Sequence, residues 1–199
     1  MRPDPLILAF DTSAAHCAAA LLSGDRVIVN RHEDMGRGQA ERLMPLLEEV
    51  LAEGGATWRD LAAIGVGIGP GNFTGIRISV AAARGLALSL GVPAVGVSTL
   101  EAQAHGQTRP VWSLVDARRD HLYAQHLGID PAPAVIPASD AADLSPVIGP
   151  HANTALPSAI ARIAAARLAQ GGDIPRPAPL YVRAADAAPP RDPAPVILP

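Results

Sequence analysis

A glycine-rich loop, GPGNFTG at residues 69–75, is the first stretch of this sequence that could do chemistry. It follows an apolar run of strand length and precedes a long amphipathic run, so it lies where a strand gives way to a helix. Asn72 is a good helix N-cap, and the backbone N–H groups after it lie at the positive end of a helix dipole. Such a turn can hold an anion such as a phosphate.

The loop matches neither of the common phosphate-binding motifs. A Walker loop needs a lysine after its second glycine, and all 16 basic residues of this chain are arginines. The dinucleotide fingerprint fails because Thr74 stands at its third glycine position and Gly75 comes one residue late. Two interpretations stay open on these residues: a general anion site, or a tight strand-to-helix turn with Arg77 on a solvated face. The candidate residues, with the end of the first strand, are Asp11, Thr12, Ser13, Gly69, Pro70, Gly71, Asn72, Phe73, Thr74, Gly75 and Arg77.

Two carboxylates, Asp11 and Asp116, end apolar strand-like runs, where actin-like kinases and ribonuclease-H-like nucleases carry metal ligands. Two-metal chemistry needs three or four converging carboxylates. The third would be Glu41, Glu48 or Glu49, which lie among partners for solvated helix charges. The sequence therefore disfavours a nuclease.

The other reactive side chains form no recognisable site. The histidines, at positions 16, 32, 105, 121, 126 and 151, contain no pair at metal-ligand spacing, and the single cysteine, Cys17, lies in the apolar run AHCAAALL. No serine has the Gly-x-Ser-x-Gly setting of a hydrolase. We therefore predict no catalytic residue and no metal site, and we expect a buried structural thiol.

The elements that would position the loop alternate between strands and helices. Strands are expected at 6–10, 16–22, 27–31, 62–68 and 94–97, and helices at 39–53, 73–90 and 99–104, with Pro45 expected to kink the first turns of the 39–53 helix or to mark where it becomes regular. The first three strands form an antiparallel meander. The later ones follow helical crossovers and should be parallel, which gives a βββαβα core.

The second half begins as another meander, with strands at 111–115 and 122–127, but is much reduced. Fourteen of the 20 prolines lie between residues 128 and 199, which leaves one clear helix at 158–170 and a short apolar segment at 180–182. We expect no fixed structure in the last dozen residues. The division is an N-terminal lobe at 1–106 and a reduced, proline-rich C-terminal lobe with a flexible tail at 107–199.

Composition excludes several classes of protein. The net charge of −3 and the scattered arginines give no electrostatic footprint for autonomous nucleic-acid binding. The N-terminus lacks a basic region before a long apolar run, and we expect no apolar segment to reach the roughly 18 residues that a membrane span requires, so a cytoplasmic protein is expected. Small side chains on two faces of the 73–90 helix fit either an ordinary core helix or one that also packs on another chain.

Five stretches of the sequence resemble the TsaB family, bacterial subunits that support threonylcarbamoyl transfer to adenosine 37 of certain tRNAs. They are LILAFDTSAAHCAAALL, GRGQAERLMPLLEEVL, the long segment from residue 67 to 102, DARRDHLYA and PLYVR, and together they cover about two thirds of the chain. The resemblance is specific at 6–13, 69–88 and 116–123.

The resemblance implies a two-lobed α/β protein with an actin-like, ribonuclease-H-like (ASKHA) fold and a degenerate ATP site. It implies a non-catalytic accessory subunit that dimerises with the catalytic subunit TsaD, is joined by the ATPase TsaE, reaches tRNA only through that complex, and forms a homodimer when alone. It implies no cofactor beyond a weak or interface-bound adenine nucleotide. Carried over by position, the partner-interface candidates are Leu43, Leu46, Leu47, Val50, Ile76, Val80, Ala83 and Arg84.

Two departures and two alternatives accompany this resemblance. Gln39 stands where the family commonly has a histidine, which weakens any proton-transfer role there, and the short second lobe leaves no tRNA or nucleotide contacts to assign. The alternatives are a stand-alone ATP-dependent kinase or ATPase that uses Asp11 and residues 69–74, and a glycoprotease-like hydrolase.

Overall fold

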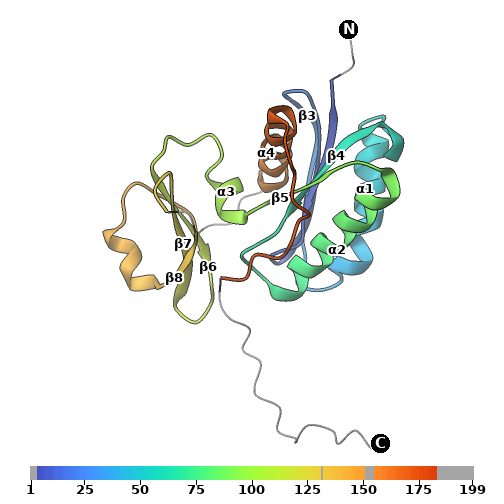
Figure 1. The fold of residues 1–199 in the computed structure, drawn as a ribbon. Coiled ribbons are helices and arrows are strands. Elements are labelled where there is room, and N and C mark those ends of the chain that lie inside the picture. The colour runs from blue at the N-terminus through green and yellow to red at the C-terminus, as the bar shows by residue number, and fades with distance from the viewer. Residues whose placement is uncertain (1–3, 131, 151–154, 183–199) are drawn as a thin grey trace, which may run out of the picture.

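The computed structural model describes residues 4–130, 132–150 and 155–182 (Figure 1). His151 and the expected flexible tail lie outside these residues.

A five-stranded sheet forms the centre of the first lobe, in the order β3-β2-β1-β4-β5. Its strands are β1 (Leu6–Asp11), β2 (His16–Ser23), β3 (Arg26–Asp34), β4 (Leu61–Gly67) and β5 (Ala94–Val97). The first three pair antiparallel, and β4 and β5 run parallel to β1. The meander and the parallel crossovers are therefore as predicted, although β3 is longer than its apolar residues indicated.

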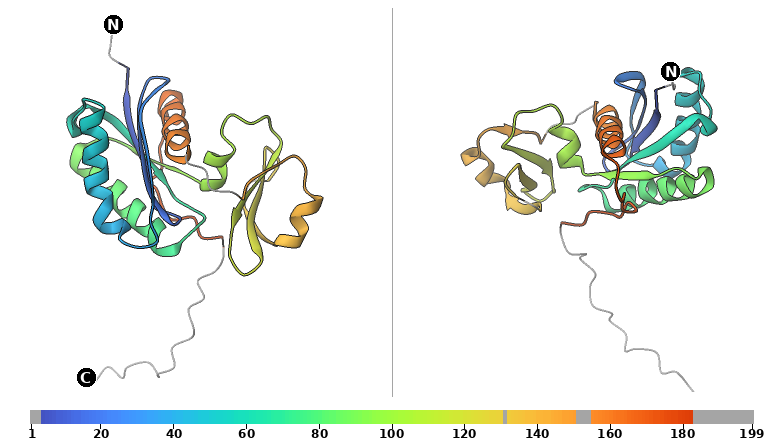
Figure 2. Two further views of the ribbon diagram at one scale, coloured as in Figure 1. Left: turned by 180° about the vertical axis from the view of Figure 1, so that it is seen from behind. Right: turned by 45° about the horizontal axis from the view of Figure 1, so that its top comes forward.

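Helices cover both faces of this sheet (Figure 1, Figure 2). On one face lie α1 (Gln39–Glu53) and α2 (Phe73–Leu90), and on the other lies α4 (Leu156–Gln170). In β1, Leu8 and Phe10 join the core under α1 and α2, whereas Ile7 and Ala9 join the core under α4. This two-sided burial explains why β1 is a continuous apolar run with no alternating polar residues.

The second lobe is a small four-stranded sheet in the order β8-β7-β6-β9. Its elements are β6 (Val111–Asp116), β7 (His121–Leu127), β8 (Ala134–Pro137), the 3-10 helix η2 (Ala138–Asp143) and β9 (Val147–Ile148). Two short helical elements precede it in the chain, η1 (Trp58–Asp60) and α3 (Thr99–Gln103). The sequence indicated β6 and β7 but not β8 and β9, which are short and lie in the proline-rich region.

The helix α4 returns from the second half of the chain to complete the core of the first lobe. Its residues Ile160 and Ala164 pack against β4 at Gly65, where an added Cβ would lie 3.1 Å and 3.2 Å from them. The boundary between residues 106 and 107 separates the two sheets, but α4, which the sequence analysis grouped with the second lobe, belongs to the core of the first.

The helix α1 continues through Pro45.

By length and composition alone, α2 could cross a membrane, with 18 residues and a mean hydropathy of 1.2, which corrects the expectation that no apolar segment reaches this length. Ala83 of α2 joins the core on the first sheet. Only 28% of the α2 residues are buried, so one side of α2 packs on the sheet and most of its apolar and small-residue surface is left open.

Residues 173–182, here called the C-terminal strap, run beside β5 and α2 (Figure 1). The Leu180 N–H donates to the Ile68 carbonyl at 2.8 Å, and Pro177 packs against Gly96 of β5. The strap thus ties the end of the described chain to the glycine-loop side of the first lobe.

Candidate functional site

The glycine loop is packed directly against the turn that joins β1 to β2. A Cβ added to Gly75 would lie 1.9 Å from the Thr12 carbonyl oxygen, and one added to Gly71 would lie 2.3 Å from the Ser13 carbonyl oxygen. Backbone cannot move aside as the end of a flexible side chain can. These two glycines are therefore required for the close approach of two backbone segments.

Hydrogen bonds hold the two segments together. The Thr12 hydroxyl donates to the Gly75 carbonyl at 2.7 Å, and the Asn72 N–H donates to the Ser13 carbonyl at 2.5 Å. The Asn72 side chain accepts from the Gly75 N–H at 3.0 Å, so it caps α2 as the sequence predicted. Two of the N–H groups at this helix start thus serve the chain's own atoms, which favours the tight-turn interpretation of the loop.

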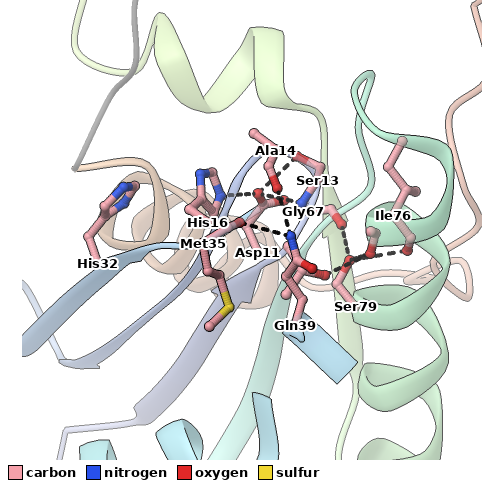
Figure 3. Close-up of polar contacts among 12 residues, drawn as sticks. Asp11, Ser13, Ala14, His16, His32, Met35, Gln39, Gly67, Ile76 and Ser79 are labelled. Carbon is pink, nitrogen blue, oxygen red and sulfur yellow. Dashed lines mark hydrogen bonds and ion pairs between the residues drawn. The ribbon is translucent and has the colours of Figure 1, made fainter. Parts of the chain in front are cut away.

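A further hydrogen bond fixes α2 on β4. Ser79 is fully buried, and its hydroxyl lies 3.1 Å from both the Gly67 and the Ile76 carbonyl oxygens (Figure 3). Because a buried hydroxyl without a partner is costly, this contact sets the height of α2 along the strand.

Asp11 is fully buried at the end of β1 and organises the same turn (Figure 3). Its Oδ2 accepts from the Ser13 N–H at 2.9 Å and from the Ser13 hydroxyl at 2.8 Å, and it lies 2.7 Å from His16 Nε2. Its Oδ1 has no hydrogen-bond partner within the described part of the chain and lies beside Gly67, where an added Cβ would be 1.8 Å away. The Asp11 side chain therefore points into the protein, where its hydrogen bonds hold the β1–β2 turn in place.

This cluster has the residue types of a hydrolytic triad but not its connectivity. A triad places the imidazole between the hydroxyl and the carboxylate, so that the imidazole takes the hydroxyl proton. Here the hydroxyl of Ser13 and the imidazole of His16 both bond the same oxygen of Asp11. The Ser13 hydroxyl donates its hydrogen bond to the Asp11 carboxylate and not to an imidazole, so no histidine activates it as a nucleophile.

Gln39 also supports this turn. Its side-chain amide donates to the Ala14 carbonyl at 3.4 Å and to the Met35 carbonyl at 3.1 Å (Figure 3). The residue that departs from the family pattern thus ties the start of α1 to the β1–β2 turn.

A cavity of about 360 Å³ lies between the lobes. From the first lobe, Ser13, His16 and Asn72 line it, and from the second, Asp116 and Tyr123 do. Asp11 is not among the lining residues, so the two strand-end aspartates do not converge on this cavity. Asp116 accepts from the Arg118 N–H at 2.8 Å, which orders the β6–β7 turn.

Arg77 does not point into the glycine loop. Its guanidinium lies 3.7 Å from the centre of the Phe73 ring, and its Nε donates to the Tyr181 hydroxyl at 2.9 Å. The sequence placed Phe73 and Arg77 in the anion loop, whereas the structure places them in a contact with the C-terminal strap. The Tyr181 partner is 104 residues away, which no local pattern indicates.

The proposed interface residues require a correction. Leu43, Leu46, Leu47, Val50, Ile76, Val80 and Ala83 are all at most 3% exposed, and only Arg84 lies on the surface. The four residues of α1 and Ala83 pack with Leu8 and Phe10 of the central strand. The apolar stripe found by helical spacing is the face that this chain uses for its own core.

A different face of the helix pair is open. Met44 is 38% exposed and Leu88 is 82% exposed, and Ala81 and Gly85 lie on the same stripe of α2 as Leu88. The other flank of α1 is tied to β3 by the Arg42–Glu33 and Arg31–Glu53 ion pairs, so Met44 lies on the flank toward α2. We call Met44, Glu48, Ala81, Gly85 and Leu88 the outward α1–α2 face.

Cys17 is a buried thiol, as the sequence predicted. Burial raises its pKa to about 11, with a smaller contribution from Glu33, so the reactive thiolate is disfavoured. Among the described residues, no group of three or more His, Cys, Asp or Glu side chains could hold a metal ion.

Comparison with known proteins assigns the family. Residues 31–180 match the model of the family described as TsaD: tRNA N6-adenosine threonylcarbamoyltransferase. The chain belongs to this family. Its relatives include the tRNA threonylcarbamoyladenosine biosynthesis protein TsaB of Escherichia coli K12, 37% identical over 123 residues, which cover 59% of this chain and 52% of that protein. The chain thus spans about half the length of the first curated relatives it matches, and its resemblance to TsaB proteins is confirmed.

A longer match and a solved structure extend this relationship. The uncharacterized protein Rv3421c of Mycobacterium tuberculosis H37Rv is 34% identical over 209 residues, covering 92% of this chain and 94% of that protein. The structure of YeaZ from Pseudomonas aeruginosa superposes with a TM-score of 0.69 at 27% identity, covering 89% of this chain and 99% of that chain. The predicted α/β, actin-like fold is thereby confirmed.

Proposed function

We propose that this chain is a non-catalytic accessory subunit in the synthesis of N6-threonylcarbamoyladenosine on tRNA. It belongs to the family that carries the transferase name, and its relatives named TsaB are biosynthesis proteins of this modification. In this proposal the chain pairs with a TsaD-type catalytic subunit and holds it in a competent state.

The contact between the β1–β2 turn and the glycine loop carries the non-catalytic part of the proposal. The Thr12 and Ser13 carbonyls fill the space beside Gly75 and Gly71, where a nucleotide phosphate would have to approach the backbone. Carbonyl oxygens repel an anion. The one serine and histidine beside this loop share a single carboxylate oxygen, which also disfavours a glycoprotease-like hydrolase.

The outward α1–α2 face supports the pairing. Ala81 and Gly85 are small enough for another backbone to approach closely, and Met44 and Leu88 expose apolar surface at the edges. Two helices of this length can supply roughly 800 Å² per partner, the area of a standard interface. The proposal therefore moves the interface from the buried stripe to this face, where Arg84 lies at the margin.

The assembly context follows from the same proposal. A TsaE-type ATPase joins the pair, tRNA is modified on the catalytic subunit, and the protein acts in the cytoplasm. Without its partner the chain covers its outward face by forming a homodimer.

Reconstitution tests this function. Purified TsaD-type and TsaE-type proteins from the same organism are supplied with the threonylcarbamoyl donor and tRNA, with and without this chain, and modified adenosine is measured by mass spectrometry of digested tRNA. Modification that depends on the chain supports the proposal. Equal modification without it would contradict the accessory role, and turnover by the chain alone would contradict its non-catalytic part.

One observation favours a second candidate, a nucleotide-dependent enzyme of the same fold. The cavity of about 360 Å³ between the lobes carries Asp116, whose exposed carboxylate could meet a metal–nucleotide complex. Calorimetry with ATP and magnesium separates the candidates. Micromolar binding by wild type that is lost in Asp116→Asn would favour the enzyme, whereas no binding by the isolated chain favours the accessory subunit.

A further inference from the structure

A row of arginines and aromatic rings lies where one flank of α2 meets the C-terminal strap. Its members are Phe73, Arg77 and Arg84 from α2, with Arg176 and Tyr181 from the strap, and we call it the arginine seam. Arg84 and Arg176 line one groove, and Tyr181 contacts Phe73 and Arg77, so the strap runs alongside α2. Arg77 and Arg84 are seven residues apart, or about 10 Å along the helix.

At one end of the arginine seam, two aromatic rings remain open to solvent around a fixed guanidinium. The Phe73 and Tyr181 ring centres are 5.0 Å apart, and these residues are 44% and 45% exposed. Arg77 lies over the Phe73 ring and gives one N–H to Tyr181. Its four other N–H donors make no hydrogen bond with any described residue, and its orientation is already set.

At the other end lies a groove of about 460 Å³, and among the described residues that line it the charged ones are Arg84 and Arg176. The rest of the lining is apolar or small, and includes Leu88, Ile174 and Pro177. Neither arginine forms an ion pair with the carboxylates of the described chain. Two arginines on one side of α2 and a third on the strap, with no acidic residue among the described residues that line the groove, leave local positive charge on a chain whose net charge is −3.

We propose that the arginine seam binds a single-stranded segment of RNA. Bases stack on exposed aromatic rings and on arginine planes, and guanidinium groups pair with the phosphates between them. An acidic peptide would use the arginines but would leave the two rings without a role, so the rings decide in favour of RNA. This inference goes beyond the proposed function, which needs no RNA contact by this chain.

Fluorescence anisotropy tests the binding directly. The full-length chain is titrated into a fluorescein-labelled 12-nucleotide single-stranded RNA at low salt, and the titration is repeated at three salt concentrations. Single strands lose affinity with a log–log slope of roughly 0.7 per phosphate contact, so three arginines predict a slope of about 2. Arg84→Glu and Arg176→Glu should each weaken binding at least tenfold and reduce the slope.

The matched control is Arg26→Glu, which makes the same charge change on β3 at the far edge of the first sheet. Arg26 is exposed and its side chain forms no hydrogen bond or ion pair with any described residue, so this variant reports the effect of net charge alone. The seam is supported if the two seam variants lose affinity and this control does not. Because Arg84 and Arg176 are on the surface, unchanged melting temperatures are expected for all three variants.

Two results would overturn the inference. The first is equal loss of affinity in the seam variants and in Arg26→Glu, or no RNA binding by any of them. The second is displacement of bound RNA by oligo-glutamate at equal charge concentration together with no effect of Phe73→Leu, which would assign the arginine seam to an acidic protein partner. Co-elution with a TsaD-type partner is measured on Arg176→Glu, because Arg176 lies on the C-terminal strap and is not part of the outward α1–α2 face. Unchanged co-elution is expected for this variant and separates failure of the seam from failure of the proposed function.

Discussion

Gly85 offers a substitution that should separate partner binding from folding. It lies mid-way along the outward side of α2, and a Cβ added there meets no atom within 4 Å. Replacing an exposed helix-interior glycine with alanine stabilises a protein by roughly 0.5–1 kcal/mol, and glutamate is also a better helix former than glycine. For a chain of this size, 1 kcal/mol corresponds to about 2–4 °C in melting temperature. Gly85→Glu should therefore melt no lower than wild type.

The same substitution should abolish pairing. A side chain where Ala81 and Gly85 allow close approach forces the partner away, and an unpaired charge in an interface core costs roughly 3–5 kcal/mol, more than a hundredfold in affinity. Calorimetric titration with the TsaD-type partner measures the loss. Ala166→Glu is the control, because it adds the same charge to an exposed position on α4, on the opposite face of the sheet. Wild-type affinity in Gly85→Glu would refute the outward α1–α2 face as the interface.

Three further predictions concern the fold itself. Gly75→Ala should destabilise by roughly 1–3 kcal/mol in urea denaturation, because the added Cβ meets the Thr12 carbonyl at 1.9 Å; wild-type stability would show that the two segments are not in contact. Cys17, with its pKa raised to about 11, should resist iodoacetamide at pH 8 until urea unfolds the chain, as mass spectrometry can follow; rapid alkylation of the native protein would contradict its burial. The hydrogen bond from Arg42 lowers the pKa of Glu33, so this stabilisation is present above the ordinary Glu pKa and is lost as the pH falls through the lowered one. Melting temperature should therefore fall less in Arg42→Gln than in wild type between about pH 5 and pH 3, by a small margin because the pair is partly exposed; parallel curves would exclude the contribution.

Local pattern was enough to predict most elements of the first lobe. The bounds predicted for α1, α2 and β5 agree with the structure because each carries its own end signals, such as Asn72 before α2 and Gly91 after it. The apolar run of β1 was recognisable as a buried strand for the same reason. In the second lobe, β8 and β9 were missed because strands of four and two residues carry too little periodicity to detect.

The direction in which α2 faces could not be predicted from its sequence. One stripe of the helix is apolar and another is made of small residues, and both fit a core or an interface equally well. What decides between them is long-range packing. Ser79 bonds the Gly67 carbonyl, and α4 arrives from the other end of the chain to occupy the opposite face of the sheet. Helical periodicity therefore identified the apolar stripe correctly, but this stripe packs on the chain's own sheet and not on another subunit.

The glycines of this region show why the loop resembled a phosphate site. A phosphate loop uses glycines to let an anion approach the backbone, and here Gly71 and Gly75 let a second backbone segment approach instead. Both uses demand the same residue type at the same strand-to-helix turn, so composition alone cannot distinguish them. The distinction lies 63 residues away, in the Thr12 hydroxyl that bonds the Gly75 carbonyl. A chain that has closed this turn on itself has little left there for a nucleotide, and its open apolar surface is on the other side of α2, where a partner can reach it.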